Sequence, residues 1–220
     1  TAFHNPEQIT GTVRVNCDGV STSEFRIEDS IAAFDVAAGH ASLSLSETRI
    51  THVASGRTST INFKADAPLH PEAAAIAEFR MAEFPLAFPA SLLGLREDEF
   101  GGDVSVAAVV NVPMNRLLDV MAYSGHGTLS APHLVAKGEV ISNAQLEWSL
   151  GSGRFSVHRF GGQVAAVAMQ GNAHLSLVSP YRFAGTCTLS ATELESLSRV
   201  ACRLSNADLG MRGALEMKGL

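Results

Sequence analysis

Apolar and polar residues alternate along most of this chain. In residues 42–46, 145–150 and 174–177, for example, every second side chain is apolar and its neighbours are polar. Because successive side chains of a strand point to opposite faces of a sheet, this period predicts strands with one apolar face and one polar face. We expect strands at residues 12–17, 42–50, 59–65, 77–82, 103–110, 144–150, 154–159, 163–170, 172–178, 182–189 and 207–218.

Short turn sequences separate the expected strands. They contain glycine, serine or proline, and lie at residues 54–56, 101–102, 151–153, 161–162 and 179–180. Connections this short leave no room for the crossover helices that parallel strands need. Consecutive strands are therefore expected to pair as antiparallel hairpins.

Three segments depart from the alternation and predict short helices. Residues 191–200 place leucines at three-residue steps behind a threonine that can cap a helix. Residues 114–121 follow a proline, and residues 84–95 form a third apolar segment that Pro89 interrupts. We expect these helices to be insertions between strands.

A pair of short signatures recurs at a fixed offset of 60 residues. Phe-Gly-Gly-Asp-Val at residues 100–104 returns as Phe-Gly-Gly-Gln-Val at residues 160–164, and Gly-His-Gly-Thr-Leu-Ser-Ala at residues 125–131 returns as Gly-Thr-Cys-Thr-Leu-Ser-Ala at residues 185–191. The common order and spacing indicate two copies of one structural unit. Stacked units favour an elongated architecture over a compact enzyme domain. The expected fold class is therefore all-β, an elongated and strongly curved antiparallel sheet with a few short inserted helices.

The composition predicts a folded chain and argues against a nucleic-acid partner. Of the 220 residues, 46% are hydrophobic and 17% are charged, which suffices for a buried interior. The 19 glycines suit short strands that are broken by turns. The formal net charge is −6 and the 16 lysines and arginines are spread along the chain, whereas binding to phosphates needs clustered positive charge.

No catalytic motif emerges, so the chain is not expected to be an enzyme. Gly151-Ser152-Gly153 lacks the GxSxG pattern of a nucleophile elbow, and no glycine-rich loop precedes the Lys-Ser or Lys-Thr pair of a phosphate-binding loop. Three adjacent acidic residues at 97–99 suit a solvated turn, because carboxylates adjacent in sequence rarely flank one bond. We expect neither catalysis nor a cofactor.

The histidines and cysteines show no metal-binding pattern. His126 and His133 are seven residues apart, and none of the eight histidines has HxH, HxxxH or HExxH spacing. His158 alternates with an apolar neighbour and is expected on the polar face. The three cysteines are interpreted as small buried residues, with a Cys187–Cys202 disulfide left open for an oxidising compartment.

Membrane-spanning helices are not predicted, because no run of 18 apolar residues is present. The chain starts at Thr1 without an initiator methionine or a signal peptide, and it ends at Leu220 within an alternating segment. We expect it to be a fragment of a longer protein.

Several of these segments together resemble a known family. They are residues 155–164, Gly171, residues 179–189 and, after a leucine-rich turn, residues 208–215. The order and spacing of their glycines and alternating apolar residues resemble the C-terminal part of AsmA-like proteins, the bacterial envelope family that includes TamB-type proteins. The resemblance covers about residues 76–220. Residues 1–75 share only the alternating pattern and are expected to form an N-terminal part of the same sheet.

The resemblance implies a non-enzymatic segment of a protein that is anchored in the inner membrane and projects into the periplasm. Its curved sheet would form a groove with an apolar concave face. Family members are linked to outer-membrane biogenesis and are proposed to move phospholipid between the two membranes. The implied partners are phospholipid or another lipid, the envelope membranes and other envelope proteins. The anchor helix of the family is absent from this sequence, so the localisation follows from the resemblance alone.

A lipid-carrying groove also fits the alternation. An acyl chain that crosses water exposes methylenes at a cost of about 0.8 kcal/mol each, so a transport path needs a continuous apolar trough. Twist and glycine kinks can curl a sheet with one apolar face into such a trough. The side chains expected to line it are Ile61, Phe63, Phe79, Met81, Val104, Val106, Leu146, Trp148, Leu175, Leu177, Met211, Leu215 and Met217.

Two alternatives remain open. The same positions could form the core of a closed β-sandwich that serves as a structural module, because alternation alone does not distinguish a groove from a core. A parallel β-solenoid that binds polysaccharide or acts as an adhesin would also show repeats and many glycines. Solenoid coils, however, recur about every 20–30 residues, and a sugar site favours more aromatic residues than one Trp and two Tyr.

Overall fold

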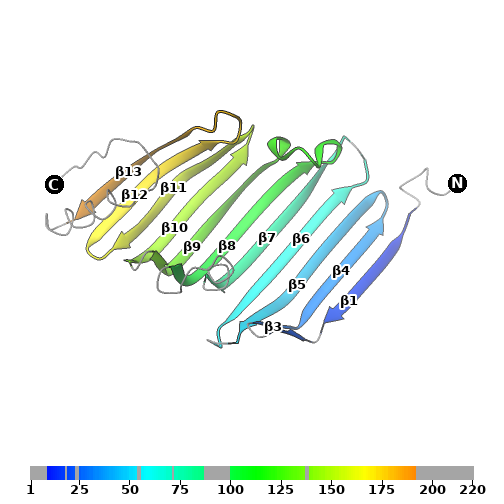
Figure 1. Ribbon diagram of the computed structural model, residues 1–220. Coiled ribbons are helices and arrows are strands. Elements are labelled where there is room, and N and C mark those ends of the chain that lie inside the picture. The colour runs from blue at the N-terminus through cyan, green and yellow to red at the C-terminus, as the bar shows by residue number, and fades with distance from the viewer. Residues whose placement is uncertain are drawn as a thin grey trace.

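The described part of the chain forms one antiparallel β-sheet. The computed structural model describes residues 9–17, 19–22, 25–53, 56–70, 72–86, 100–136 and 139–191. Within these residues thirteen strands belong to a single sheet, and every pairing is antiparallel. Figure 1 shows the strands side by side in an elongated, open sheet. The predicted all-β fold class is confirmed.

Eleven of the strands follow one another across the sheet, and β1 and β13 form its two ends. In sheet order they are β1 (Gly11–Cys17), β4 (Ser30–Ala37), β5 (His40–His52), β6 (Thr58–Pro68), β7 (Ala74–Pro85), β8 (Phe100–Pro113), β9 (Ser124–Ala136), β10 (Glu139–Gly151), β11 (Arg154–Val164), β12 (Val167–Ser176) and β13 (Phe183–Ala191). The remaining two, β2 (Val20–Ser21) and β3 (Phe25–Glu28), pair with each other, and β3 also pairs with β5. We call these eleven strands the main path. From β4 onward, each strand of the main path pairs with the next strand of the path in sequence.

Two hairpins close through two residues in the left-handed backbone region. Ala38 and Gly39 have φ of 49° and 76° between β4 and β5, and Ser152 and Gly153 have φ of 51° and 67° between β10 and β11. Positive φ at both central positions matches the right-handed twist of the flanking strands. The predicted turn at residues 151–153 is therefore confirmed.

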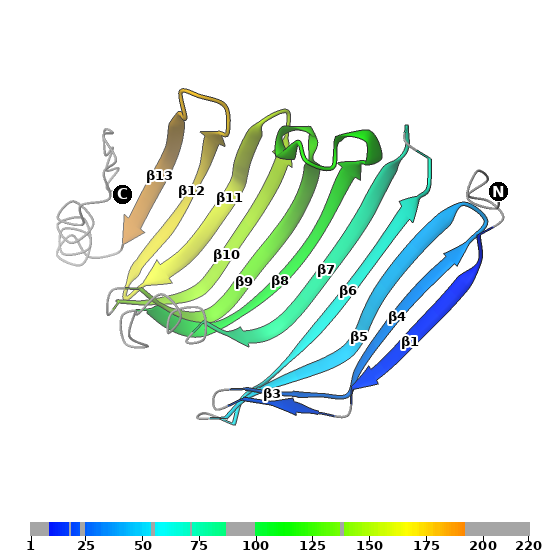
Figure 2. The same cartoon turned by 45° about the vertical axis from the view of Figure 1, so that its right-hand side comes forward.

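Bulges accompany the curvature of the sheet. Five strand pairs show a shift in register. At one shift, Glu83 has φ of 53° and its backbone N–H donates to Ser105 Oγ at 3.1 Å. At another, Asn143 has φ of 51°. An extra residue in one strand increases the local twist and bends the sheet, and Figure 2 shows the strongly curved sheet.

The strands predicted at residues 163–170 and 172–178 have the wrong boundaries, because residues 167–170 and 172–176 lie in one strand, β12. β11 continues to Val164 and β12 begins at Val167, so a tight turn lies inside the first predicted strand. Residues 161–162, predicted as a turn, belong to β11. The turn is made by two alanines, of which Ala165 has φ of 51°. Alanine gives no turn signal, whereas the glycine pair gave a false one.

The sequence also failed to predict β4 and β9. Residues 125–127, with two glycines, lie within β9 and pair with both β8 and β10. Residues 101–102 likewise lie within β8, where Gly102 has φ of 105° at a register shift. Glycine within a strand often marks a bulge or the close approach of a neighbouring group rather than a chain reversal.

The helix predicted at residues 114–121 is instead two single-turn 3-10 helices. These are η3 (Met114–Arg116) and η4 (Val120–Ala122), in the connection between β8 and β9. The helix predicted at residues 84–95 begins inside β7, which extends to Pro85. Residues 87–95, the helix expected after Ala191 and the strand expected at 207–218 lie outside the described residues.

The two copies of the glycine signature do not occupy equivalent strands. Residues 100–104 begin β8, whereas residues 160–164 end β11. The partner signatures lie in β9 and β13, so the first copy spans two strands and the second spans three. The two copies of the signatures, 60 residues apart, therefore do not mark a unit whose strands repeat one by one. The expected boundary after residue 75 falls inside β7, within a continuous sheet.

The architecture differs from both alternatives that the sequence left open. A parallel solenoid would have parallel ladders between coils, whereas all pairings here are antiparallel. A sandwich would have two facing sheets, whereas the described residues form a single sheet with open ends.

Candidate functional site

The two faces of the sheet differ in their chemistry. Residues that pair directly across antiparallel strands project from the same face. One row of paired residues crosses all eleven strands of the main path and contains only apolar side chains and glycine. The row is Val15, Ala32, Leu45, Phe63, Phe79, Ala108, Gly127, Trp148, Val157, Ala173 and Gly185.

Two further rows flank the first on the same face. One also runs from β1 to β13 through Val13, Phe34, Leu43, Ala65, Ala77, Val110, Gly125, Leu150, Phe155, Leu175 and Phe183. The other runs from β6 to β13 through Ile61, Met81, Val106, Leu129, Leu146, Phe160, Gly171 and Cys187. We call the surface that these three rows form the apolar face.

In the middle of the sheet, the apolar face is more crowded than the opposite face. On β7, Ala77, Phe79 and Met81 are half-buried, whereas Glu78 and Arg80 between them are exposed. A single layer of described strands carries both faces. The difference therefore reflects side chains that pack against one another on the apolar face.

Two glycines show how close this packing is. A Cβ added at Gly127 would lie 2.6 Å from Cζ2 of Trp148, and a Cβ added at Gly171 would lie 2.6 Å from Cε1 of Phe160. On the opposite face, a Cβ at Gly161 would have its nearest neighbour at 3.6 Å, an ordinary contact. Aromatic side chains thus pack directly over these two glycines of the apolar face.

Three buried hydroxyl groups near one rim of the apolar face have partners within the protein. Oγ of Ser30 and Oγ1 of Thr48 are 3.0 Å apart, and Ser59 Oγ donates to the backbone carbonyl of Glu83 at 2.9 Å. A paired hydroxyl presents no unsatisfied group to an apolar ligand. These residues therefore do not create polar anchoring points beside the apolar rows.

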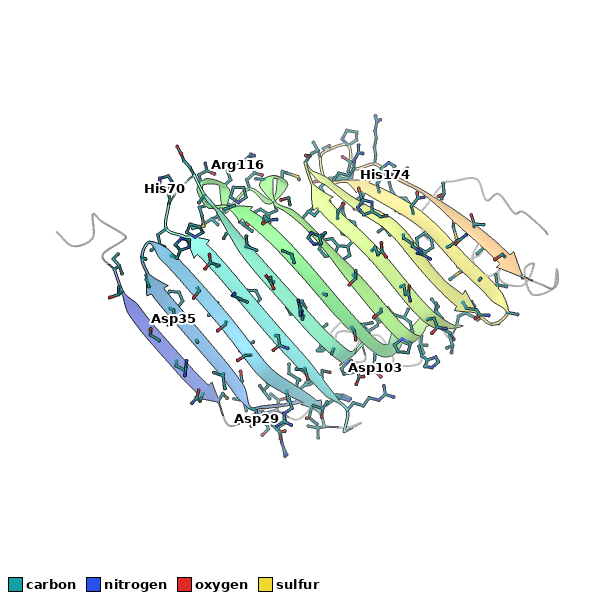
Figure 3. All side chains as sticks on the ribbon, turned by 180° about the vertical axis from the view of Figure 1, so that it is seen from behind. Asp29, Asp35, His70, Asp103, Arg116 and His174 are labelled. Atoms are coloured by element: carbon teal, nitrogen blue, oxygen red, sulfur yellow. The ribbon has the colours of Figure 1, made fainter. Side chains whose placement is uncertain are left out.

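The opposite face, which we call the polar face, carries hydroxyl and charged side chains. Thr12 Oγ1 donates to Oδ1 of Asp35 at 2.7 Å. His158 Nε2 lies 2.7 Å from Ser149 Oγ, which confirms the expectation that His158 lies on this face. Figure 3 views the sheet from this side, with Asp35 labelled. Water can solvate this face, whereas the apolar face offers it no partners.

The apolar face is most exposed at its two ends. Val13 and Val15 on β1 are 58% and 56% exposed, and Phe183 on β13 is 56% exposed. In the middle, Phe79 and Trp148 are half-buried. The apolar surface therefore extends to both end strands, and no described residue covers those ends.

The strand register brings most of the predicted lipid-contacting residues together. Eight of them lie on the apolar face, namely Ile61, Phe63, Phe79, Met81, Val106, Leu146, Trp148 and Leu175. Val104 on β8 is buried, pairs with Phe84 and lies beyond the three rows. Leu177 follows the end of β12, and its backbone N–H donates to the carbonyl of Gly153 at 2.7 Å. Met211, Leu215 and Met217 lie outside the described residues.

The sequence prediction omitted other members of the apolar face. Phe34 on β4 and Leu129 on β9 were omitted because neither strand was predicted. Leu43 and Leu45 on β5 alternate with serines, so the pattern that identified the other residues could have identified these two.

Two hollows are lined mainly by residues outside the three apolar rows, although Met81 and Val106 of the third row also line the second. One, of about 510 Å³, has Cys17, Ile31 and the ion pair of Asp29 with Arg49 in its lining. The other, of about 350 Å³, lies largely on the polar face, around Arg80. No group of three or more His, Cys, Asp or Glu among the described residues is placed to hold a metal ion.

Cys17 and Cys187 are free thiols. Burial raises the pKa of the Cys187 thiol, which lies on the apolar face. A raised pKa disfavours the reactive thiolate. Cys202, the other half of the disulfide considered from the sequence, lies outside the described residues.

The described residues include no helix with the length and hydropathy needed to cross a membrane. Comparisons with protein-family models, with curated proteins and with solved structures found no match to this chain.

Proposed function

We propose that this chain is a non-enzymatic lipid-handling segment whose apolar face binds phospholipid acyl chains. The observation that carries the proposal is the pair of apolar rows that cross all eleven strands, from Val15 to Gly185 and from Val13 to Phe183, without a polar side chain. Water-soluble monomers rarely expose a contiguous apolar surface larger than a few hundred Å². A surface of this kind needs an occupant, and an acyl chain fits its chemistry.

The length of the apolar face supports acyl chains as the occupant. Ten steps between neighbouring strands, at about 4.8 Å each, give a band of about 48 Å. One leaflet of a bilayer is about 15 Å deep in hydrocarbon, so the band exceeds one acyl chain severalfold. Several chains could lie along the sheet, or one could move along it.

The uniform chemistry of the band supports movement rather than fixed binding. A ligand held at one place needs polar groups that fix its orientation. The three hydroxyls near the band are paired within the protein, as described for Ser30, Thr48 and Ser59. Each buried methylene contributes about 0.8 kcal/mol wherever it lies on such a surface, so an acyl chain can shift along the rows at little cost.

The wider role follows from the resemblance to AsmA-like proteins. In this proposal the segment belongs to a periplasmic protein that is anchored in the inner membrane, and its groove carries phospholipid towards the outer membrane during outer-membrane biogenesis. The headgroup would remain in water beside the apolar face. The chain's own residues supply the acyl-chain path and no catalysis.

Native mass spectrometry with lipid extraction tests the proposal. The protein is expressed in a bacterial periplasm and purified, and we expect phospholipid to co-purify with it. Leu43→Asp places a charge on the apolar face at a side chain that is 43% exposed, so the fold should tolerate it. Bound lipid should fall severalfold, because an acyl chain cannot solvate a carboxylate.

The matched control is Ser44→Asp, on the same strand but on the polar face, where the residue pairs with Lys64 on β6. This variant should retain its lipid. A folded wild-type protein that neither carries phospholipid nor extracts it from detergent micelles would refute the proposal.

A further inference from the structure

Two connections at one rim of the sheet carry exposed apolar side chains. Leu118, in the connection between β8 and β9, is 100% exposed, and Leu117 and Met121 beside it are also exposed. In the connection between β12 and β13, Tyr181 is 73% exposed and Val178 is also exposed. We call these five residues the apolar rim. The folded sheet gains nothing from keeping Leu118 in water.

The two connections meet at the hairpin between β10 and β11. A Cβ added at Gly153, in this hairpin, would lie 2.9 Å from Cγ2 of Val178 and 3.5 Å from Sδ of Met121. The backbone N–H of Leu177 donates to the carbonyl of Gly153 at 2.7 Å, which ties the second connection to the same hairpin. The apolar rim is therefore one surface that spans two connections.

Hydrogen bonds hold the first connection in a fixed shape. The backbone N–H of Met121 donates to Oδ1 of Asp119 at 3.0 Å, and Arg116 Nε donates to Oδ2 of the same carboxylate at 3.1 Å. The hydroxyl of Tyr123 donates to the carbonyl of Leu117 at 2.5 Å. The exposure of Leu117 and Leu118 is thus built into the loop.

Positive charge flanks the apolar rim. Arg154 begins β11 and Arg182 immediately precedes β13, and neither has an ion-pair partner among the described residues. Arg116 is paired with Asp119, the only acidic residue in residues 114–123, 151–154 and 177–182. Figure 3 shows Arg116 on the same rim as His70 and His174.

The apolar rim also continues into the apolar face. Phe183 follows Arg182 directly, opens β13 and ends the apolar row that includes Leu175 and Phe155. Its side chain is 56% exposed. The exposed ring of Phe183 therefore places the end of an apolar row two residues from Tyr181 of the rim.

We propose that the apolar rim docks on the surface of an anionic phospholipid bilayer. Leu117 and Leu118 insert below the headgroups, and Tyr181 lies at the interface with its ring in the apolar region and its hydroxyl in water. Arg154 and Arg182 contact the lipid phosphates. This proposal rests on the proposed function, because it places the open apolar face beside a bilayer that can supply acyl chains.

The shape of the surface favours a bilayer over a protein partner. A stable protein interface buries about 800 Å² on each side and has a complementary, well-packed centre. Here the fully exposed leucine stands in a loop with flanking arginines, an arrangement typical of proteins that insert a few side chains into a lipid interface.

Vesicle flotation of the full chain tests the proposal. Wild-type protein should float with vesicles that contain phosphatidylglycerol and less with vesicles of phosphatidylcholine alone. Leu118→Asp should lower the vesicle partition coefficient at least about tenfold, since a charge at a membrane-inserted position opposes insertion. The fold should be unaffected because this side chain makes no buried contact. Arg154→Glu with Arg182→Glu should abolish the preference for phosphatidylglycerol.

The matched control is Ile76→Asp, at an exposed apolar residue on the polar face of β7, which should bind vesicles like the wild type. Vesicle binding by Leu118→Asp equal to wild type, or no binding by the wild-type protein, would overturn the proposal. If Leu118→Asp instead changes the oligomeric state seen by size-exclusion chromatography but binds vesicles like the wild type, the apolar rim is a protein interface.

Lipid extraction from detergent micelles separates the two proposals. Leu118→Asp should still take up micellar phospholipid through the apolar face, while losing vesicle binding. Wild-type protein that binds vesicles but takes up no lipid would support the docking rim and refute the lipid path. Wild-type protein that takes up micellar lipid but does not bind vesicles would support the lipid path and refute the docking rim.

Discussion

The indole of Trp148 on β10 packs against the ring of Phe155 on β11, with the ring centroids 5.6 Å apart and the ring planes inclined by 30°. Both side chains project from the apolar face. The indole also fills the space over Gly127 on β9, where a Cβ would lie 2.6 Å from Cζ2. One tryptophan thus joins three strands by contact of aromatic and apolar surface.

Gly127→Ala should destabilise the sheet. The added methyl group would meet the indole of Trp148 and also the backbone oxygen of Ala107, at 2.6 Å. Overpacking of this kind costs about 1–3 kcal/mol. Urea denaturation, followed by far-ultraviolet circular dichroism, measures the free energy of unfolding.

The control for this substitution is Gly161→Ala, on the polar face, where a Cβ would make only an ordinary contact at 3.6 Å. Its free energy of unfolding should stay within about 0.5 kcal/mol of the wild type. If both variants are as stable as the wild type, the close packing described for Gly127 is incorrect.

Trp148 should report on acyl chains that occupy the apolar face. It is the only tryptophan in the chain, and it lies in the central apolar row. Phospholipids brominated along their acyl chains should quench its fluorescence, because bromine quenches on close contact. The same lipids without bromine are the control, and Leu43→Asp should reduce the quenching. Lipid binding without quenching would place the acyl chains elsewhere on the protein.

The apolar face was partly predictable because alternation is a local property. Phe63, Phe79 and Trp148 each lie in a segment whose pattern identifies the buried side without knowledge of the partner strand. Pairing then brings the separate patterns into register, as Phe63 and Phe79 are brought opposite each other. The fold class and most of the candidate site follow from this period of two.

Continuity across the sheet could not be predicted. Val15 and Gly185 lie at the two ends of one apolar row. Nothing in the sequence around either residue indicates that the two belong to the same row. A slip of one residue in any pair would move that strand's apolar residues to the polar face. Bulges at Glu83 and Asn143 help to set the register, and neither has a glycine or proline to mark it.

The buried pair of Ser30 and Thr48 should behave as a coupled unit. Their hydroxyls are 3.0 Å apart, and Thr48 is only 4% exposed. Ser30→Ala alone leaves the Thr48 hydroxyl without this partner, which should cost about 1–3 kcal/mol of unfolding free energy. Thr48→Val alone should cost a similar amount. The double variant should be less destabilised than the sum of the single variants, because no unpaired hydroxyl remains.

A double-mutant cycle in urea measures this coupling. A control cycle uses the exposed hydroxyls of Thr51 and Thr58, which are also 3.0 Å apart. Water can replace either partner there, so the coupling energy should be close to zero. Additive effects of Ser30→Ala and Thr48→Val would show that the buried hydrogen bond contributes nothing specific.

Asp119 should hold the η3–η4 connection together until the solution is strongly acidic. The hydrogen bond from Arg116 lowers the pKa of its carboxyl below the ordinary value of 3.8, and the backbone N–H of Met121 lowers it further. Because the folded-state pKa is depressed, the stabilisation is present above the unfolded value and is lost as the pH falls through the folded value. The amide signal of Met121 in an NMR titration should therefore shift with a midpoint below 3.8. Asp119→Asn removes the titrating group and should remove the transition, whereas a wild-type midpoint at or above 3.8 would mean that the carboxylate is not held by Arg116.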